Sequence, residues 1–285
     1  MKATPDIRDI IDKTILKYPS INDFVKKNGN FYIITKCRYG SISKEEETFI
    51  PEFTLAGVLF GSYHESIARK FINYLEIPPR QFTNQLKNLD NWLKKYSDYQ
   101  TKRFRDKLID NFFNSYSEIE FYDKLVTKGL MPKIDVQIGP GNNNLDFMIN
   151  FNSHNIFIEL TTRFEKLDTE RKLNLNDVDP EREIFSIIQR KIDEQFQSIN
   201  DENCIILAIN IEYCKLGISL KMRENLLDYH PKNIYGLLLY REGRGQFYEN
   251  PRYSLMRDEV IFFQNLFDEP TIFEKMLAKL QSEKK

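Results

Sequence analysis

The sequence has few of the residues that build metal-stabilised or disulfide-stabilised proteins. It contains three cysteines and three histidines among 285 residues. Cys37, Cys204 and Cys214 form no CxxC pair, and the histidines lie far apart in the chain. Structural zinc sites and disulfide frameworks need closely spaced ligands or an even set of cysteines. We therefore expect neither of them here.

Long apolar runs are also missing. No stretch approaches the roughly 20 apolar residues that a membrane-spanning helix needs. Near the N-terminus, Asp6, Arg8 and Asp9 stand where a signal peptide would be apolar. The sequence therefore predicts a cytoplasmic protein with no membrane partner.

Neither sign of charge is in excess. The sequence has 41 Lys and Arg residues and 42 Asp and Glu residues, for a formal net charge of −1. A protein that wraps nucleic acid over its whole surface would be strongly basic, so a nucleic acid partner requires a local patch. The candidate is residues 87 to 107, which carry seven basic and three acidic residues. Four aromatic residues lie between these charges. They either stack on bases or, as is commoner, belong to a solvated helix and face the core of the protein.

What the sequence does contain is a globular balance of 41% hydrophobic and 29% charged residues. Its length suits two domains, or one large domain with an appended module, and we adopt the second interpretation. Residues 1 to 100 are predicted to be a mainly helical region of unknown role, and residues 101 to 285 an α/β domain with a C-terminal helical tail. Helices are expected at residues 5 to 17, 63 to 75, 81 to 96 and 101 to 128, with a short hairpin at 30 to 49.

Beyond Met131 the periodicity changes from helical to strand-like. Short apolar runs bounded by Gly, Pro and Asn predict strands at residues 133 to 138, 145 to 151, 155 to 162, 204 to 211 and 234 to 240. Helices are expected between the later strands, at residues 181 to 199 and 220 to 229. Three strands in a row suggest a meander, and the alternation that follows favours a mixed sheet covered by helices.

Two acidic residues stand within these apolar strands. Side chains alternate across a strand, so Glu159 shares a face with Phe157 and Thr161, and Asp146 shares one with Met148. If the two strands pair around the short turn between them, both carboxylates lie on one face near the same end. Carboxylates that close repel each other unless a divalent cation joins them.

A third acid is expected from the helix that precedes the sheet. Glu118 lies on the same helical stripe as Tyr122 and Leu125, which is the stripe that should pack on the sheet. A second interpretation makes Glu118 an acid in the first turn of a helix that Ser115 and Ser117 cap.

A helix glutamate followed by Leu145-Asp146-Phe147 and Ile158-Glu159-Leu160-Thr161 resembles the PD-(D/E)xK nuclease superfamily, over about residues 103 to 240. The resemblance implies a restriction-endonuclease-like fold, in which Asp146 and Glu159 bind Mg²⁺ or Mn²⁺ and Glu118 assists as a third acid or metal contact. It also implies hydrolysis of nucleic acid phosphodiesters, with DNA as the favoured substrate. A homodimer stays an open alternative.

The sequence departs from this family at Thr161, which replaces the motif lysine. Threonine carries no charge and cannot neutralise a developing oxyanion. The missing cation is expected from Arg163, which continues the strand alternation, or from Lys191, which lies four residues before Gln195 on the next helix. Two alternatives stay open: a nuclease fold that has lost its chemistry and serves as a nucleic-acid-binding or protein-interaction scaffold, and an unrelated α/β domain.

Overall fold

The computed structural model describes nine stretches of the chain: residues 7–26, 54–62, 79–138, 144–164, 180–196, 204–213, 234–241, 244–253 and 255–268. The chain divides into two compact units, Met1–Asp123 and Lys124–Lys285. In the described residues, no helix is long and apolar enough to cross a membrane. The predicted helices at residues 63 to 75 and 220 to 229, and the predicted hairpin at 30 to 49, lie outside the described residues.

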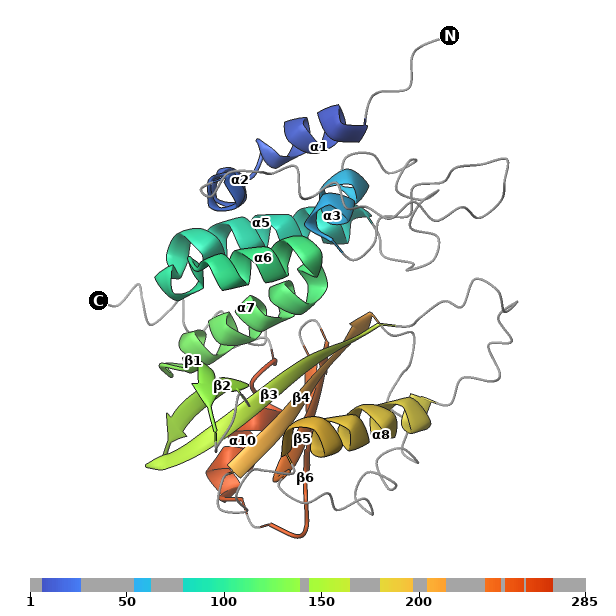
Figure 1. Ribbon diagram of the computed structural model, residues 1–285. Coiled ribbons are helices and arrows are strands. Elements are labelled where there is room, and N and C mark those ends of the chain that lie inside the picture. The colour runs from blue at the N-terminus through green and yellow to red at the C-terminus, as the bar shows by residue number, and fades with distance from the viewer. Residues whose placement is uncertain are drawn as a thin grey trace, which may run out of the picture. The chain divides into compact units, whose positions relative to one another are not determined.

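The first unit is helical (Figure 1). Its elements are α1 (Ile7–Ile15), α2 (Pro19–Lys26), α3 (Leu55–Gly61), α5 (Pro79–Lys95), the 3₁₀ turn η2 (Ser97–Tyr99), α6 (Lys102–Asp110) and most of α7 (Phe112–Thr127). Aromatic pairs join α5 and the residue that follows it to α7, with ring centroids 5.3 Å apart for Trp92 and Tyr116 and 5.0 Å for Tyr96 and Tyr122. These contacts explain why the units divide after Asp123, whereas the sequence placed the boundary at residue 100.

Asn111 splits the single helix that was predicted over residues 101 to 128. Its backbone N–H donates to the Lys107 carbonyl at the end of α6, and its side chain accepts from Asn114 N at 3.3 Å at the start of α7. Asparagine favours such positions because its side chain competes for backbone hydrogen bonds. The predicted capping by Ser115 and Ser117 is wrong, since both residues are fully buried inside α7.

The second unit is built on a six-stranded mixed sheet with strand order β1-β2-β3-β4-β5-β6. The strands are β1 (Lys133–Gln137), β2 (Asn144–Phe151), β3 (His154–Phe164), β4 (Cys204–Tyr213), β5 (Gly236–Arg241) and β6 (Arg244–Glu249). The first three are antiparallel, β3, β4 and β5 are parallel, and β6 is antiparallel to β5. The predicted meander and the predicted mixed sheet are confirmed.

A two-residue turn joins β2 to β3. Asn152 and Ser153 both have positive φ, 50° and 68°. A two-residue hairpin turn with positive φ at both positions matches the right-handed twist of the strands and favours asparagine. The turn sets a register in which Phe147 faces Ile158.

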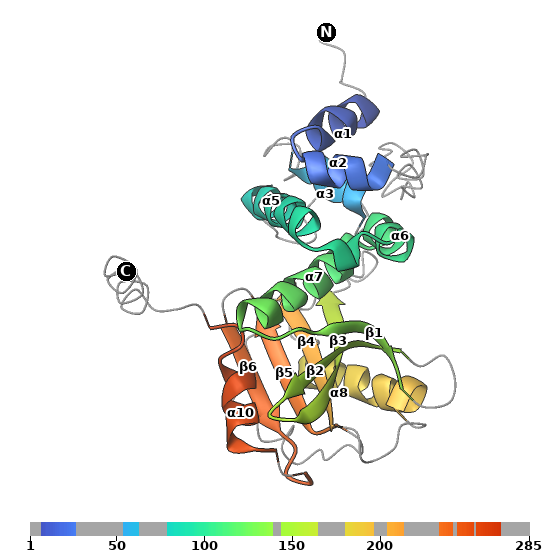
Figure 2. The same cartoon turned by 90° about the vertical axis from the view of Figure 1, so that its left-hand side faces the viewer.

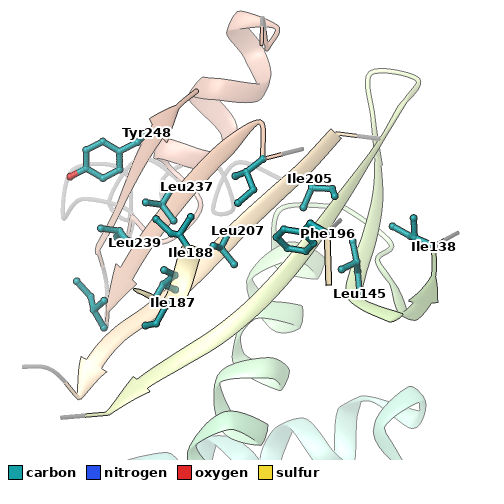
Figure 3. Close-up of a cluster of buried hydrophobic side chains, with 13 residues drawn as sticks. Ile138, Leu145, Ile187, Ile188, Phe196, Ile205, Leu207, Leu237, Leu239 and Tyr248 are labelled. Carbon is teal, nitrogen blue, oxygen red and sulfur yellow. The ribbon is translucent and has the colours of Figure 1, made fainter. Parts of the chain in front are cut away.

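Helices cover both faces of the sheet. On one face, α8 (Pro180–Lys191) and the π-helical turn η3 (Ile192–Phe196) pack on an apolar cluster that includes Leu207, Leu237 and Tyr248 (Figure 3). On the other face lies α10 (Arg257–Gln264), whose Phe263 stacks on Phe247 with centroids 5.3 Å apart (Figure 2). Tyr248 and Phe247 are neighbours on β6, so they point to opposite faces. The predicted C-terminal helical tail therefore starts later than expected from the sequence, because residues 244–249 form the strand β6.

Candidate active site

The hairpin of β2 and β3 brings Asp146 and Glu159 together. Phe147 pairs with Ile158, so the next residues along the two strands are Asp146 and Glu159. Asp146 Oδ2 accepts a hydrogen bond of 2.8 Å from the backbone N–H of Leu160. The charge of Asp146 acts directly on Glu159 and raises its pKa. The two predicted carboxylates therefore meet on the same part of the sheet.

Glu159 is a carboxylate in a largely apolar environment. It is 4% exposed and pairs across the sheet with Leu207, which belongs to the apolar cluster under α8. Burial is the main cause that raises the pKa of Glu159, to about 7, and repulsion by Asp146 adds to it. Lys191 and Gln195 lower the pKa of Glu159, because the positive charge of Lys191 and the hydrogen bonds that both side chains donate favour the charged carboxylate.

Lys191 supplies the positive charge at this site. Its ammonium group forms an ion pair with Glu159 Oε1, and the two side chains are 15% and 5% exposed. The same ammonium donates to Gln195 Oε1 at 2.9 Å. Lys191 therefore reaches Glu159 from the helix that follows β3.

The apolar cluster explains how a lysine from α8 reaches Glu159. Ile187 and Ile188 in α8 and Phe196 in η3 are buried in it, with exposures of 8%, 3% and 0%. Each large apolar side chain removed from water contributes about 1.5–3 kcal/mol. These contacts hold the end of α8 over β3 and β4, so the last turn delivers Lys191 to the site.

Two other predicted site residues are not brought into this group by the described contacts. Glu118 is 9% exposed in the first unit, where Lys107 forms an ion pair with it. Arg163 lies within β3, but its side chain is outside the described residues. Thr161, at the position of the motif lysine, is half-buried two residues after Glu159.

The donor set suits a hard divalent cation that keeps part of its water. Mg²⁺ is commonly held by one or two carboxylates together with waters and substrate phosphates. Asp146 and Glu159 provide such a pair. Burial and the repulsion by Asp146 raise the pKa of Glu159, and a bound cation would favour its charged form. Among the described residues, no group of three or more His, Cys, Asp or Glu side chains could hold a metal ion. As a pair, Asp146 and Glu159 fit a cation that keeps part of its water.

The aromatic residues of the basic patch are part of the core of the first unit. Tyr96, Tyr99 and Phe104 are 7%, 1% and 5% exposed, and Trp92 packs on Tyr116. They are therefore not placed to stack on bases, and the commoner interpretation of the pattern is confirmed. The exposed basic residues of the patch are Lys87, Lys94, Lys95, Lys102, Arg103 and Lys107.

Comparisons with known proteins give little further guidance. No protein-family model and no curated protein matches the sequence. A solved structure of a CdiA-CT/CdiI toxin and immunity complex from Burkholderia pseudomallei is similar, with 12% identity and a TM-score of 0.33. The similarity covers 48% of this chain and 86% of that chain. A TM-score this low supports neither a fold nor a function for this chain.

Proposed function

We propose that this protein hydrolyses nucleic acid phosphodiesters, with DNA as the favoured substrate, in a reaction that depends on Mg²⁺ or Mn²⁺. The observation that carries the proposal is the meeting of Asp146, Glu159 and Lys191 on one face of the sheet. Two carboxylates and one ammonium group are what a hydrolase needs to hold a divalent cation and to neutralise a phosphate. The antiparallel meander followed by parallel strands is consistent with a restriction-endonuclease-like fold.

The side chains have separate roles in this proposal. Asp146 and Glu159 would hold the cation, which supplies an activated water and neutralises phosphate charge when bound. The hydrogen bond from Leu160 N fixes one oxygen of Asp146 and so orients that carboxylate. Lys191 stands in for the lysine that Thr161 replaces, because it brings a positive charge to Glu159 from α8.

Arg163 has a supporting role in the same proposal, as the second candidate for the missing cation. The role of Glu118 as an assisting acid stays a prediction from the sequence. A catalytically inactive scaffold with the same fold remains the alternative, favoured by the absence of a lysine at Thr161. The two functions differ in one measurable respect, since a scaffold, whether it binds nucleic acid or another protein, does not cleave nucleic acid.

Plasmid cleavage tests the proposal. The full chain should nick or linearise supercoiled DNA with Mg²⁺ or Mn²⁺, and a chelator should stop the reaction. Glu159→Gln keeps the shape of the side chain but removes the carboxylate, so cleavage should fall by about a hundredfold or more. Lys191→Met should reduce it to a similar degree.

Matched controls come from exposed charges in the same unit. Asp258→Asn on α10 and Arg190→Met, next to Lys191 on α8, change the same charges at exposed positions. Both variants should cleave like the wild type. Binding of DNA without cleavage at any metal concentration would favour the scaffold, and cleavage that survives Glu159→Gln would refute the proposed site.

A further inference from the structure

The π-helical turn η3 places Gln195 beside the site. In a continuous α-helix, at about 100° per residue, residue 195 would lie within about 20° of Ile188 and so face the core. The wider turn accommodates one more residue. Phe196 is the residue that enters the apolar cluster, fully buried, while Gln195 stays half-buried near Glu159.

Gln195 contacts both charged partners. Its Oε1 accepts from the Lys191 ammonium at 2.9 Å, and a hydrogen bond from its side chain lowers the pKa of Glu159. An ammonium group only donates and a carboxylate only accepts. The amide must therefore turn its carbonyl oxygen to Lys191 and its NH₂ group to Glu159, so one planar group spans the ion pair.

A restraint of this kind is needed because Lys191 reaches the site on a flexible stem. A lysine side chain loses much of its rotamer freedom when it is fixed in one geometry. Residues 187 and 188 anchor the helix, but they do not fix the far end of the lysine. The Gln195 amide contacts the ammonium group itself.

We propose that Gln195 is a positioning residue that holds the Lys191 ammonium against the Glu159 carboxylate. The positive charge of Lys191 is then fixed where it can neutralise the substrate phosphate. This inference rests on the proposed function. Gln195 itself does not touch the substrate, so its loss should lower kcat and leave KM nearly unchanged.

A spectroscopic test examines the contact without metal or substrate. In the full chain labelled with ¹⁵N-lysine, a hydrogen-bonded ammonium exchanges its protons slowly and gives its own cross-peak. Lys191→Met assigns that cross-peak by removing it. Gln195→Met should abolish it, whereas Gln195→Glu, which keeps an oxygen for Lys191, should retain it. Gln189→Met, at an exposed position on α8, is the control that should leave it unchanged.

Kinetics complete the test with Mg²⁺ and DNA. Gln195→Met should lower kcat about tenfold to a hundredfold with KM within about twofold, the size usual for residues that orient a catalytic group. Gln195→Glu should recover part of the loss.

The two proposals fail in different ways. A cross-peak that persists in Gln195→Met, or a change confined to KM, overturns the positioning role even if the wild type cleaves DNA. A wild type that never cleaves, combined with a cross-peak that Gln195→Met abolishes, overturns the proposed function while it supports the contact.

Discussion

Replacing Glu159 by glutamine should make the metal-free protein more stable at neutral and alkaline pH, although it abolishes the proposed activity. Glu159 is buried beside Asp146, and together these causes raise its pKa from 4.5 to about 7 in spite of Lys191. The folded protein therefore binds this proton more tightly than the unfolded chain does. Glutamine resembles the protonated acid in shape and never ionises.

The magnitude follows from the difference between the two pKa values. Each pKa unit corresponds to about 1.4 kcal/mol, so a shift from 4.5 to about 7 makes the ionised group cost about 3 kcal/mol of folding free energy. The stabilisation by the protonated acid is fully present below pH 4.5, the unfolded value, and is lost as the pH rises through about 7. Between pH 5 and pH 8, the wild type should lose about 2 to 3 kcal/mol relative to Glu159→Gln.

Urea unfolding with a chelator, at pH 5 and pH 8, measures this loss. The difference in unfolding free energy between the variant and the wild type is compared at the two pH values, which cancels the titrating groups that do not interact with Glu159. Asp258→Asn, an exposed carboxylate on α10, should show no such pH dependence. Millimolar Mg²⁺ at pH 8 should then narrow the difference, because it binds the wild-type carboxylates and stabilises the folded state. An equal difference at both pH values would refute the raised pKa.

Three further outcomes are expected. Thr161→Lys should restore part of the cleavage lost in Lys191→Met, since a lysine at that strand position also points to Glu159, and plasmid nicking by the double variant measures the rescue. The double variant Lys87→Gln, Lys94→Gln should weaken DNA binding. If both residues contact phosphates, the slope of log affinity against log salt should fall by about 1.8, measured by fluorescence anisotropy at several salt concentrations. An unchanged slope would show that the patch is not part of the DNA interface. Glu118→Gln should lower the cleavage rate about tenfold if Glu118 assists the reaction, and an unaltered rate constant would exclude it from the site.

The acid pair could be predicted from the sequence because it depends on local rules. Period-two alternation assigns Asp146 and Glu159 to faces, and the short turn at Asn152 and Ser153 fixes which residues pair. These two steps need no knowledge of distant contacts. The reach of Lys191 to Glu159 does need it, because it depends on the packing of α8 on the sheet.

Other features depend on contacts that alternation does not reveal. Strand β6 places Phe247 and Tyr248 on opposite faces, and both are buried, so it lacks an apolar-polar pattern. The π-helical turn arises because the apolar cluster accepts Phe196, which is a property of the packed sheet. Asn111 caps the start of α7 and so separates it from α6, although the apolar periodicity of the sequence is helical on both sides.

The order of the strands also sets the order in which the site can assemble during synthesis. Strands β2 and β3 are joined by two residues, and a β-hairpin forms in about 1–10 μs, so the two carboxylates can meet as soon as Phe164 has left the ribosome. The parallel pairing of β3 with β4 must wait for Cys204, and α8 with Lys191 lies in the connection between them. At about 5–20 residues per second, the ribosome needs seconds to make that connection. During that interval the nascent chain carries the hairpin with Asp146 and Glu159, while Lys191 is not yet in place to pair with Glu159.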